Sequence, residues 1–61
     1  MAKRSDIIRL LEKAGFISKG GAKHERWVHP DGRFTTVGRH REIPTPTARL
    51  IAKQAKIKMP K

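Results

Sequence analysis

The sequence contains no cysteine and no tyrosine, and it has only five acidic residues against 15 lysines and arginines. Without cysteine, neither a disulfide framework nor a thiolate metal site can form, so a reducing cytoplasm is the expected compartment. Runs of large apolar side chains never exceed two residues, as at Ile7-Ile8 and Leu50-Ile51. We therefore expect neither a membrane-spanning helix nor the apolar segment of a signal peptide, and we predict a soluble, intracellular protein.

The chain is short and strongly basic, with 61 residues and a formal net charge of +10. A chain of this length builds one domain around a single small core and leaves no room for a large active-site cavity. Such an excess of positive charge attracts phosphate backbones, because binding releases their condensed counterions. A nucleic acid is therefore the expected ligand, and an acidic protein partner would be compatible with the same charge.

The first part of the chain has the spacing of one helix face. Its apolar stripe consists of Ile7, Ile8, Leu10, Leu11 and Ala14. Ser5 is the expected N-cap, and Asp6 places a negative charge in the first turn, where the helix dipole favours it. Gly15 is expected to end this helix.

After Gly15 the pattern changes to that of short strands. Residues 16–19 form the first expected strand, Gly20-Gly21 a tight turn, residues 24–29 the second strand, residues 30–32 a Pro-Asp-Gly turn and residues 33–37 the third strand. These segments predict a three-stranded antiparallel sheet. Trp27 is expected in the core, with base stacking as the alternative, and Phe16 and Phe34 are expected to be packing residues.

A polar, basic connection at residues 38–44 leads to a second expected helix. Thr45 is the expected N-cap, and Pro46 suits the first helical position because its missing N–H costs nothing there. Leu50, Ile51 and Ala55 are expected to be buried, with Ala48 at the border of the stripe and Ile57 continuing it. The fold class is thus α+β in the order αβββα, with both helices on one face of the sheet and the other face open to solvent.

His24 is the candidate catalytic residue. Cleavage of an RNA phosphodiester needs a base for the 2′-hydroxyl, an acid for the leaving 5′-oxygen and positive charge near the phosphate. Histidine exchanges protons near neutral pH, and His24 follows the glycine turn between Lys23 and Arg26, whose charges favour its neutral, proton-accepting form. The alternative interpretation is an ordinary surface histidine at the start of a strand.

The other two histidines have different expected roles. His40 lies between Arg39 and Arg41 and would contact phosphate or act as a second proton-transfer group, whereas His29 is expected only to flank a turn. The separations of five and eleven residues between the histidines match no compact ligand spacing, so no metal and no cofactor are expected. Glu25 is not expected to orient its neighbour His24, because adjacent strand residues point to opposite faces.

Taken together, the motifs resemble the HicA toxins of bacterial toxin-antitoxin systems. The resemblance spans residues 3–57 as a single domain and leaves residues 58–61 as a basic tail. It rests on the end of the first helix at residues 13–16, the glycine turn and histidine at residues 20–24, the His-Pro-Asp-Gly turn at residues 29–32, the run at residues 35–40 and the closing helix at residues 50–55.

This resemblance implies a fold like that of a double-stranded-RNA-binding domain and a type II toxin that cleaves mRNA without a metal. It assigns catalysis to His24 and implies a HicB antitoxin as partner. Lys23, Arg26, Arg39 and His40 are the residues expected to bind the RNA. Two positions depart from the usual pattern: Lys23 stands where a small hydroxyl residue is common, and Gly38 where proline is common.

Two hypotheses therefore follow from the sequence. The first is a metal-independent endoribonuclease in which His24 acts as general base or acid. The second is a catalytically silent module that binds double-stranded RNA with the same basic surface. A DNA-binding regulator is less favoured, because the chain shows no helix-turn-helix pattern.

Overall fold

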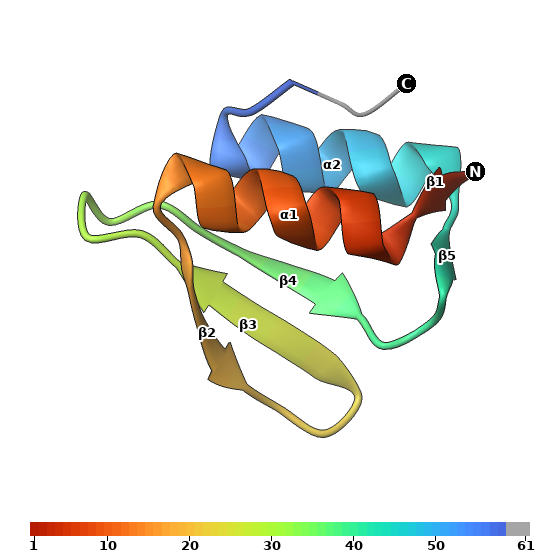
Figure 1. The fold of residues 1–61 in the computed structure, drawn as a ribbon, viewed down its shortest axis with the longest axis horizontal. Helices are drawn as coiled ribbons and strands as arrows, with labels where there is room; N and C mark the ends of the chain where they lie inside the picture. The colour runs from red at the N-terminus through yellow and green to blue at the C-terminus, as the bar shows by residue number, and fades with distance from the viewer. Residues whose placement is uncertain (59–61) are drawn as a thin grey trace.

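The computed structural model describes residues 1–58, so Lys58 is the only described residue of the expected tail. Its elements are β1 (Ala2–Lys3), α1 (Arg4–Ala14), β2 (Ile17–Gly20), β3 (His24–Val28), β4 (Phe34–Gly38), β5 (Glu42–Ile43) and α2 (Thr45–Ala55). The expected α+β order of helix, three strands and helix is confirmed. The helices lie together on one side of the sheet formed by β2, β3 and β4 (Figure 1).

Both helices begin earlier than the sequence pattern predicts, α1 by two residues and α2 by one. Lys3 occupies the N-cap of α1, so Ser5 lies inside the helix, and the backbone N–H of Arg4 donates to the Arg41 carbonyl at 2.9 Å. A contact distant in sequence therefore takes the place of the expected serine cap. Pro44 similarly precedes α2, so Thr45 is helical and is not the cap, although Pro46 does lie in the first turn.

Gly15 ends α1 as expected. Its φ of 101° lies in the left-handed region that favours glycine, and its N–H donates to the Glu12 carbonyl. The chain can therefore reverse directly into β2.

The register of the sheet decides which side chains face the helices. Trp27 on β3 lies opposite Thr35 on β4, and the next pair on that face is Glu25 and Val37. Trp27, Thr35 and Val37 are buried, so this is the face that the helices cover. Side chains alternate along a strand, and the open face therefore carries His24, Arg26, Phe34 and Thr36.

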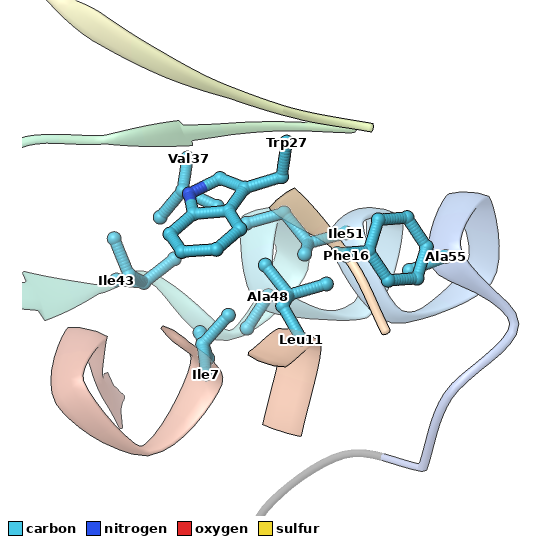
Figure 2. Packing of buried hydrophobic residues seen from close by; sticks show 9 residues of the cluster. All are labelled: Ile7, Leu11, Phe16, Trp27, Val37, Ile43, Ala48, Ile51 and Ala55. Atoms are coloured by element: carbon cyan, nitrogen blue, oxygen red, sulfur yellow. The ribbon is translucent and has the colours of Figure 1, made fainter. Parts of the chain in front are cut away.

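The core joins residues of both helices to residues of the sheet (Figure 2). Its members are Ile7, Leu11, Phe16, Trp27, Val37, Ile43, Ala48, Ile51 and Ala55. The expected core positions of Phe16 and Trp27 are confirmed. Two other expectations are wrong, because Phe34 and Leu50 are each 54% exposed. Phe34 alternates with the buried Thr35, and on α2 the stripe that packs inward is centred on Ala48 and Ile51.

A second, two-stranded sheet pairs β1 with β5, matching Ala2 with Ile43 and Lys3 with Glu42. The sequence pattern did not indicate it, since residues 38–44 read only as a polar connection. This pairing fastens the connection to the start of α1 and places Ile43 in the core.

His29 flanks its turn, as expected, and also ties that turn to α1. Its Nε2 lies 3.0 Å from the Ala14 carbonyl, and its Nδ1 lies 3.1 Å from the backbone N–H of Asp31. Because a carbonyl only accepts and a backbone N–H only donates, the ring carries its proton on Nε2 in this arrangement. His29 also packs its ring edgewise on Phe16, with centroids 5.1 Å apart.

Two neighbouring residues of α2 test this packing. Ile51→Ala should lower the free energy of unfolding by about 2–5 kcal/mol, because it opens a cavity in the core. Leu50→Ala should change it by about 0.5 kcal/mol or less, because that side chain is largely exposed. Urea denaturation followed by circular dichroism measures both. A greater loss for Leu50→Ala would contradict the observed orientation of α2.

Candidate active site and nucleic-acid interface

A turn that requires glycine places His24 at the first position of β3. Gly20 and Gly21 have φ values of 79° and 131°, which other residues rarely adopt. A Cβ atom on Gly21 would lie only 2.1 Å from the His24 carbonyl oxygen, so the chain could not close here with a side chain. His24 then pairs with Gly38 on β4 and is exposed.

His24 and His40 line the same groove, which has a volume of about 330 Å³ and is called the His24 groove below. The groove is bounded by the end of β4, the connection after it and one side of α2. Its other lining residues are Thr36, Gly38, Glu42, Ile43, Pro44, Thr47, Leu50, Ile51 and Gln54. His24 begins the hairpin of β3 and β4, and His40 follows its end, yet both side chains line this groove.

The wall of the His24 groove offers further polar groups that the sequence prediction missed. Thr36 and Thr47 contribute hydroxyls, and the Gln54 amide accepts a hydrogen bond from the buried Thr35 hydroxyl at 2.8 Å. Since its oxygen is used in this way, Gln54 presents its NH₂ group as a donor. Thr47 and Gln54 stand two turns apart on α2, so helical spacing alone could have placed them on one face.

A second, more basic groove adjoins the first and has a volume of about 640 Å³. The residues that line this basic groove are Lys3, Arg4, Ser5, Arg39, Arg41 and Glu42. Alternate residues of the connection thus serve different grooves: His40 lines the His24 groove, whereas Arg39 and Arg41 line the basic groove. Arg39 and His40, which are both expected to bind RNA, are adjacent in the sequence but line different grooves.

The other two expected RNA-binding residues lie beside His24 and not within its groove. Lys23 is exposed in the turn immediately before His24. Arg26 follows two residues later on the same open face, with its guanidinium carbon 5.5 Å from the centre of the Phe34 ring. The predicted cations therefore surround His24, but only His40 shares its groove.

Glu25 organises the other face of β3, directly beneath the candidate site. It forms an ion pair with Arg4, accepts a hydrogen bond from the Ser18 hydroxyl at 2.6 Å and lies 3.9 Å from Arg39. Its side chain is only 15% exposed. As the strand alternation predicts, Glu25 is engaged on the helix side and does not orient His24.

The two arginines extend this network to the ends of the strands. Arg4 Nε donates to the Gly38 carbonyl at 2.8 Å, at the residue that pairs with His24. Arg39 donates to the Gly21 carbonyl at 2.6 Å, within the turn that precedes His24. Glu25 therefore holds both arginines that fasten the backbone around the candidate catalytic histidine.

The same contacts lower the pKa of Glu25 from its ordinary value of 4.5. The Ser18 hydrogen bond is the main cause, burial opposes it, and the hydrogen bond from Arg4 and the charge of Arg39 lower the pKa further. The carboxylate is thus stabilised in its charged form.

Within residues 1–58, no group of three or more histidine, aspartate or glutamate side chains is arranged to hold a metal ion. In the same described part of the chain, no helix has the length and apolar character needed to cross a membrane.

Comparison with known families adds one finding. The family model described as "HicA toxin of bacterial toxin-antitoxin" matches residues 4–57. The match covers both helices and the whole three-stranded sheet, and it confirms the resemblance seen in the sequence. None of the curated proteins matches the chain.

The lowered pKa of Glu25 predicts how stability depends on pH. A carboxylate with a lowered pKa stabilises the folded state above its unfolded pKa, and this stabilisation is lost as the pH falls through the folded value. Glu25→Gln should therefore destabilise the protein by about 1–3 kcal/mol at pH 7, because Arg4 loses its charged partner. Below pH 4.5 the difference from wild type should shrink.

Urea denaturation at a series of pH values from 7 to about 3 measures this effect. The variant keeps Asp31, whose pKa is also lowered, first by the backbone N–H of Arg33 and then by its side chain. Its stability should therefore still decline in acid, but by less than that of wild type. Parallel declines in the two proteins would show that Glu25 contributes no pH-dependent stability.

Proposed function

We propose, on the premise that this chain belongs to the HicA toxins of bacterial toxin-antitoxin systems, that it is a metal-independent endoribonuclease that cleaves mRNA. The observation that carries the proposal is the shared groove of His24 and His40, with Arg39 and Arg26 around it. Imidazole groups can transfer the protons of phosphodiester cleavage, and guanidinium groups can stabilise the negative charge that develops on the phosphate.

In the proposed reaction, His24 takes the proton of the 2′-hydroxyl while the 2′-oxygen attacks the adjacent phosphorus. The bond from phosphorus to the 5′-oxygen then breaks, and the imidazolium formed in the first transfer returns its proton to that oxygen. The products are a 2′,3′-cyclic phosphate and a free 5′-hydroxyl. A positioned acid or base of this kind contributes roughly 10²–10⁴ in rate.

The cations around His24 hold the RNA in this proposal. His40 contacts the phosphate from within the groove, while Lys23 and Arg26 approach it from the open face of the sheet. Arg39, fastened to the turn through the Gly21 carbonyl, stabilises the charge that develops on the phosphate oxygens. Lys23 can supply charge where a hydroxyl residue is common in the family, and we assign it to phosphate binding.

A toxin of this kind is paired with an antitoxin, and we propose that a HicB-like protein neutralises it. The partner would meet the positive surface formed by the two grooves with acidic side chains, which also relieves the self-repulsion of a chain with net charge +10. By covering the His24 groove it would exclude mRNA. Both the substrate and the partner would place the complex in the cytoplasm.

His24→Ala tests the catalytic assignment. Wild type should cleave RNA in excess EDTA, whereas His24→Ala should lose at least about 10² in rate, because no other group takes the proton of the 2′-hydroxyl. Gel electrophoresis of a labelled RNA measures cleavage, and fluorescence anisotropy measures binding to the same RNA. Because the His24 side chain is exposed, the His24→Ala variant should bind RNA nearly as well as wild type.

Binding without cleavage by the wild type would instead favour the alternative, a catalytically silent module for double-stranded RNA. His40→Ala is a second variant in the groove. Because His40 is assigned to phosphate contact, its loss should raise KM more than it lowers kcat.

Lys23→Gln tests the assignment of phosphate contacts. The variant should bind single-stranded RNA more weakly, and the slope of log affinity against log salt should fall by about 0.7, the value for one phosphate contact. Arg9→Gln is the matched control, because Arg9 is exposed on α1, on the helix side of the sheet. Equal changes in both slopes would mean that only overall charge matters.

A further inference from the structure

Phe34 is an exposed aromatic residue in a chain with few aromatics. Its exposed fraction is 54%, whereas Phe16 and Trp27 are each 4% exposed. The register explains this difference, since Thr35 and Val37 take the inward positions of β4 and leave Phe34 on the open face of the sheet. The large apolar side chain of Phe34 is thus exposed to solvent and does not pack in the small core.

Arg26 accompanies Phe34 on the same face. Its guanidinium carbon lies 5.5 Å from the ring centre, within the range of a cation–π contact. Among the described residues, the ion pairs of Glu25 and Asp31 go to Arg4, Arg39 and Arg33, and none includes Arg26. The pair therefore presents two flat groups and a positive charge that no carboxylate in these ion pairs neutralises.

The pair lies at a defined position relative to His24. Phe34 is opposite Val28, four residues along β3 from His24, which corresponds to roughly 13 Å of strand. His24, Arg26 and Phe34 share one face, so a strand of RNA with its phosphate at His24 can reach the ring within a few nucleotides.

We propose that Phe34 and Arg26 form a base-stacking subsite and that the substrate is therefore single-stranded RNA. A base can stack on an aromatic ring or a guanidinium plane only when it has left its own helical stack. Bases within an A-form duplex are held in that stack, and the duplex is recognised through its backbone. This inference rests on the proposed function and specifies the class of RNA that the site accepts.

The charge of the surface favours nucleic acid over an apolar protein surface as the occupant. Phe34 is flanked by a cation in a chain of net charge +10, and Arg26 provides the group that a nearby phosphate binds. Ile17 is equally exposed on the same face, at 54%, but has no planar group for a base. Ile17 therefore provides a matched control that separates aromatic stacking from general apolar contact.

The experiment measures binding in the His24→Ala protein, in which RNA should stay intact. The probe is a labelled single-stranded RNA of about 12 nucleotides, compared with the same strand in a duplex. Phe34→Ala should weaken single-strand binding about tenfold, since stacking of one base contributes on that order. Phe34→Trp should restore it, Ile17→Ala should leave it nearly unchanged, and duplex affinity should not respond to Phe34→Ala.

The inference is overturned by equal losses for single strand and duplex, by equal effects of Ile17→Ala and Phe34→Ala, or by unchanged RNA binding together with weakened antitoxin binding. Circular dichroism verifies that each variant is folded. A wild-type protein that binds RNA without cutting it overturns the proposed catalysis, while the comparison of Phe34 variants still tests the subsite. The two proposals can therefore fail separately.

Discussion

The ion pair between Arg4 and Glu25 is the interaction on which the rest of the site depends. It joins the first residue of α1 to the second residue of β3, and through Arg4 Nε it also reaches the Gly38 carbonyl at the end of β4. A charge that is mostly removed from water is stable only when such partners surround it. Because Glu25 uses these partners on the helix side, its neighbour His24 is fixed in the strand and left exposed on the other side.

The scarcity of acidic residues gives each one a large effect. Glu25 holds Arg4 and Arg39, while Asp31 binds Arg33, whose guanidinium also donates to the Ala55 carbonyl at the end of α2 at 2.7 Å. These arginines stabilise the fold and are not simply surface charge. The other cations are spread over both helices, the turn before β3, the open face and the connection, where they repel one another and create a potential that favours phosphate. Arg4 and Arg33 thus serve the fold, whereas Arg39 both fastens the turn before His24 and is assigned to the RNA phosphate.

The open face explains how a fold like that of a double-stranded-RNA-binding domain could serve a different substrate. Attack by a 2′-oxygen requires it to stand in line with the leaving oxygen, which a flexible single strand reaches more readily than a regular duplex. In the proposed arrangement, the His24 groove takes the phosphate and the Phe34 ring takes a base farther along β3. Backbone and base would then be bound by different parts of one surface.

The sequence by itself determined the order of helix, three strands and helix, because local signals such as Gly15, the Gly20-Gly21 turn and the apolar spacing in α1 act within a few residues. It also indicated His24 and the cations near it. The tertiary structure alone decided that Phe34 and Leu50 are exposed, that β1 pairs with β5, and that His40 and Gln54 share a groove with His24. Strand register and helix rotation decide these features. Both depend on which distant residues fill a common core, and spacing along the chain does not encode that choice.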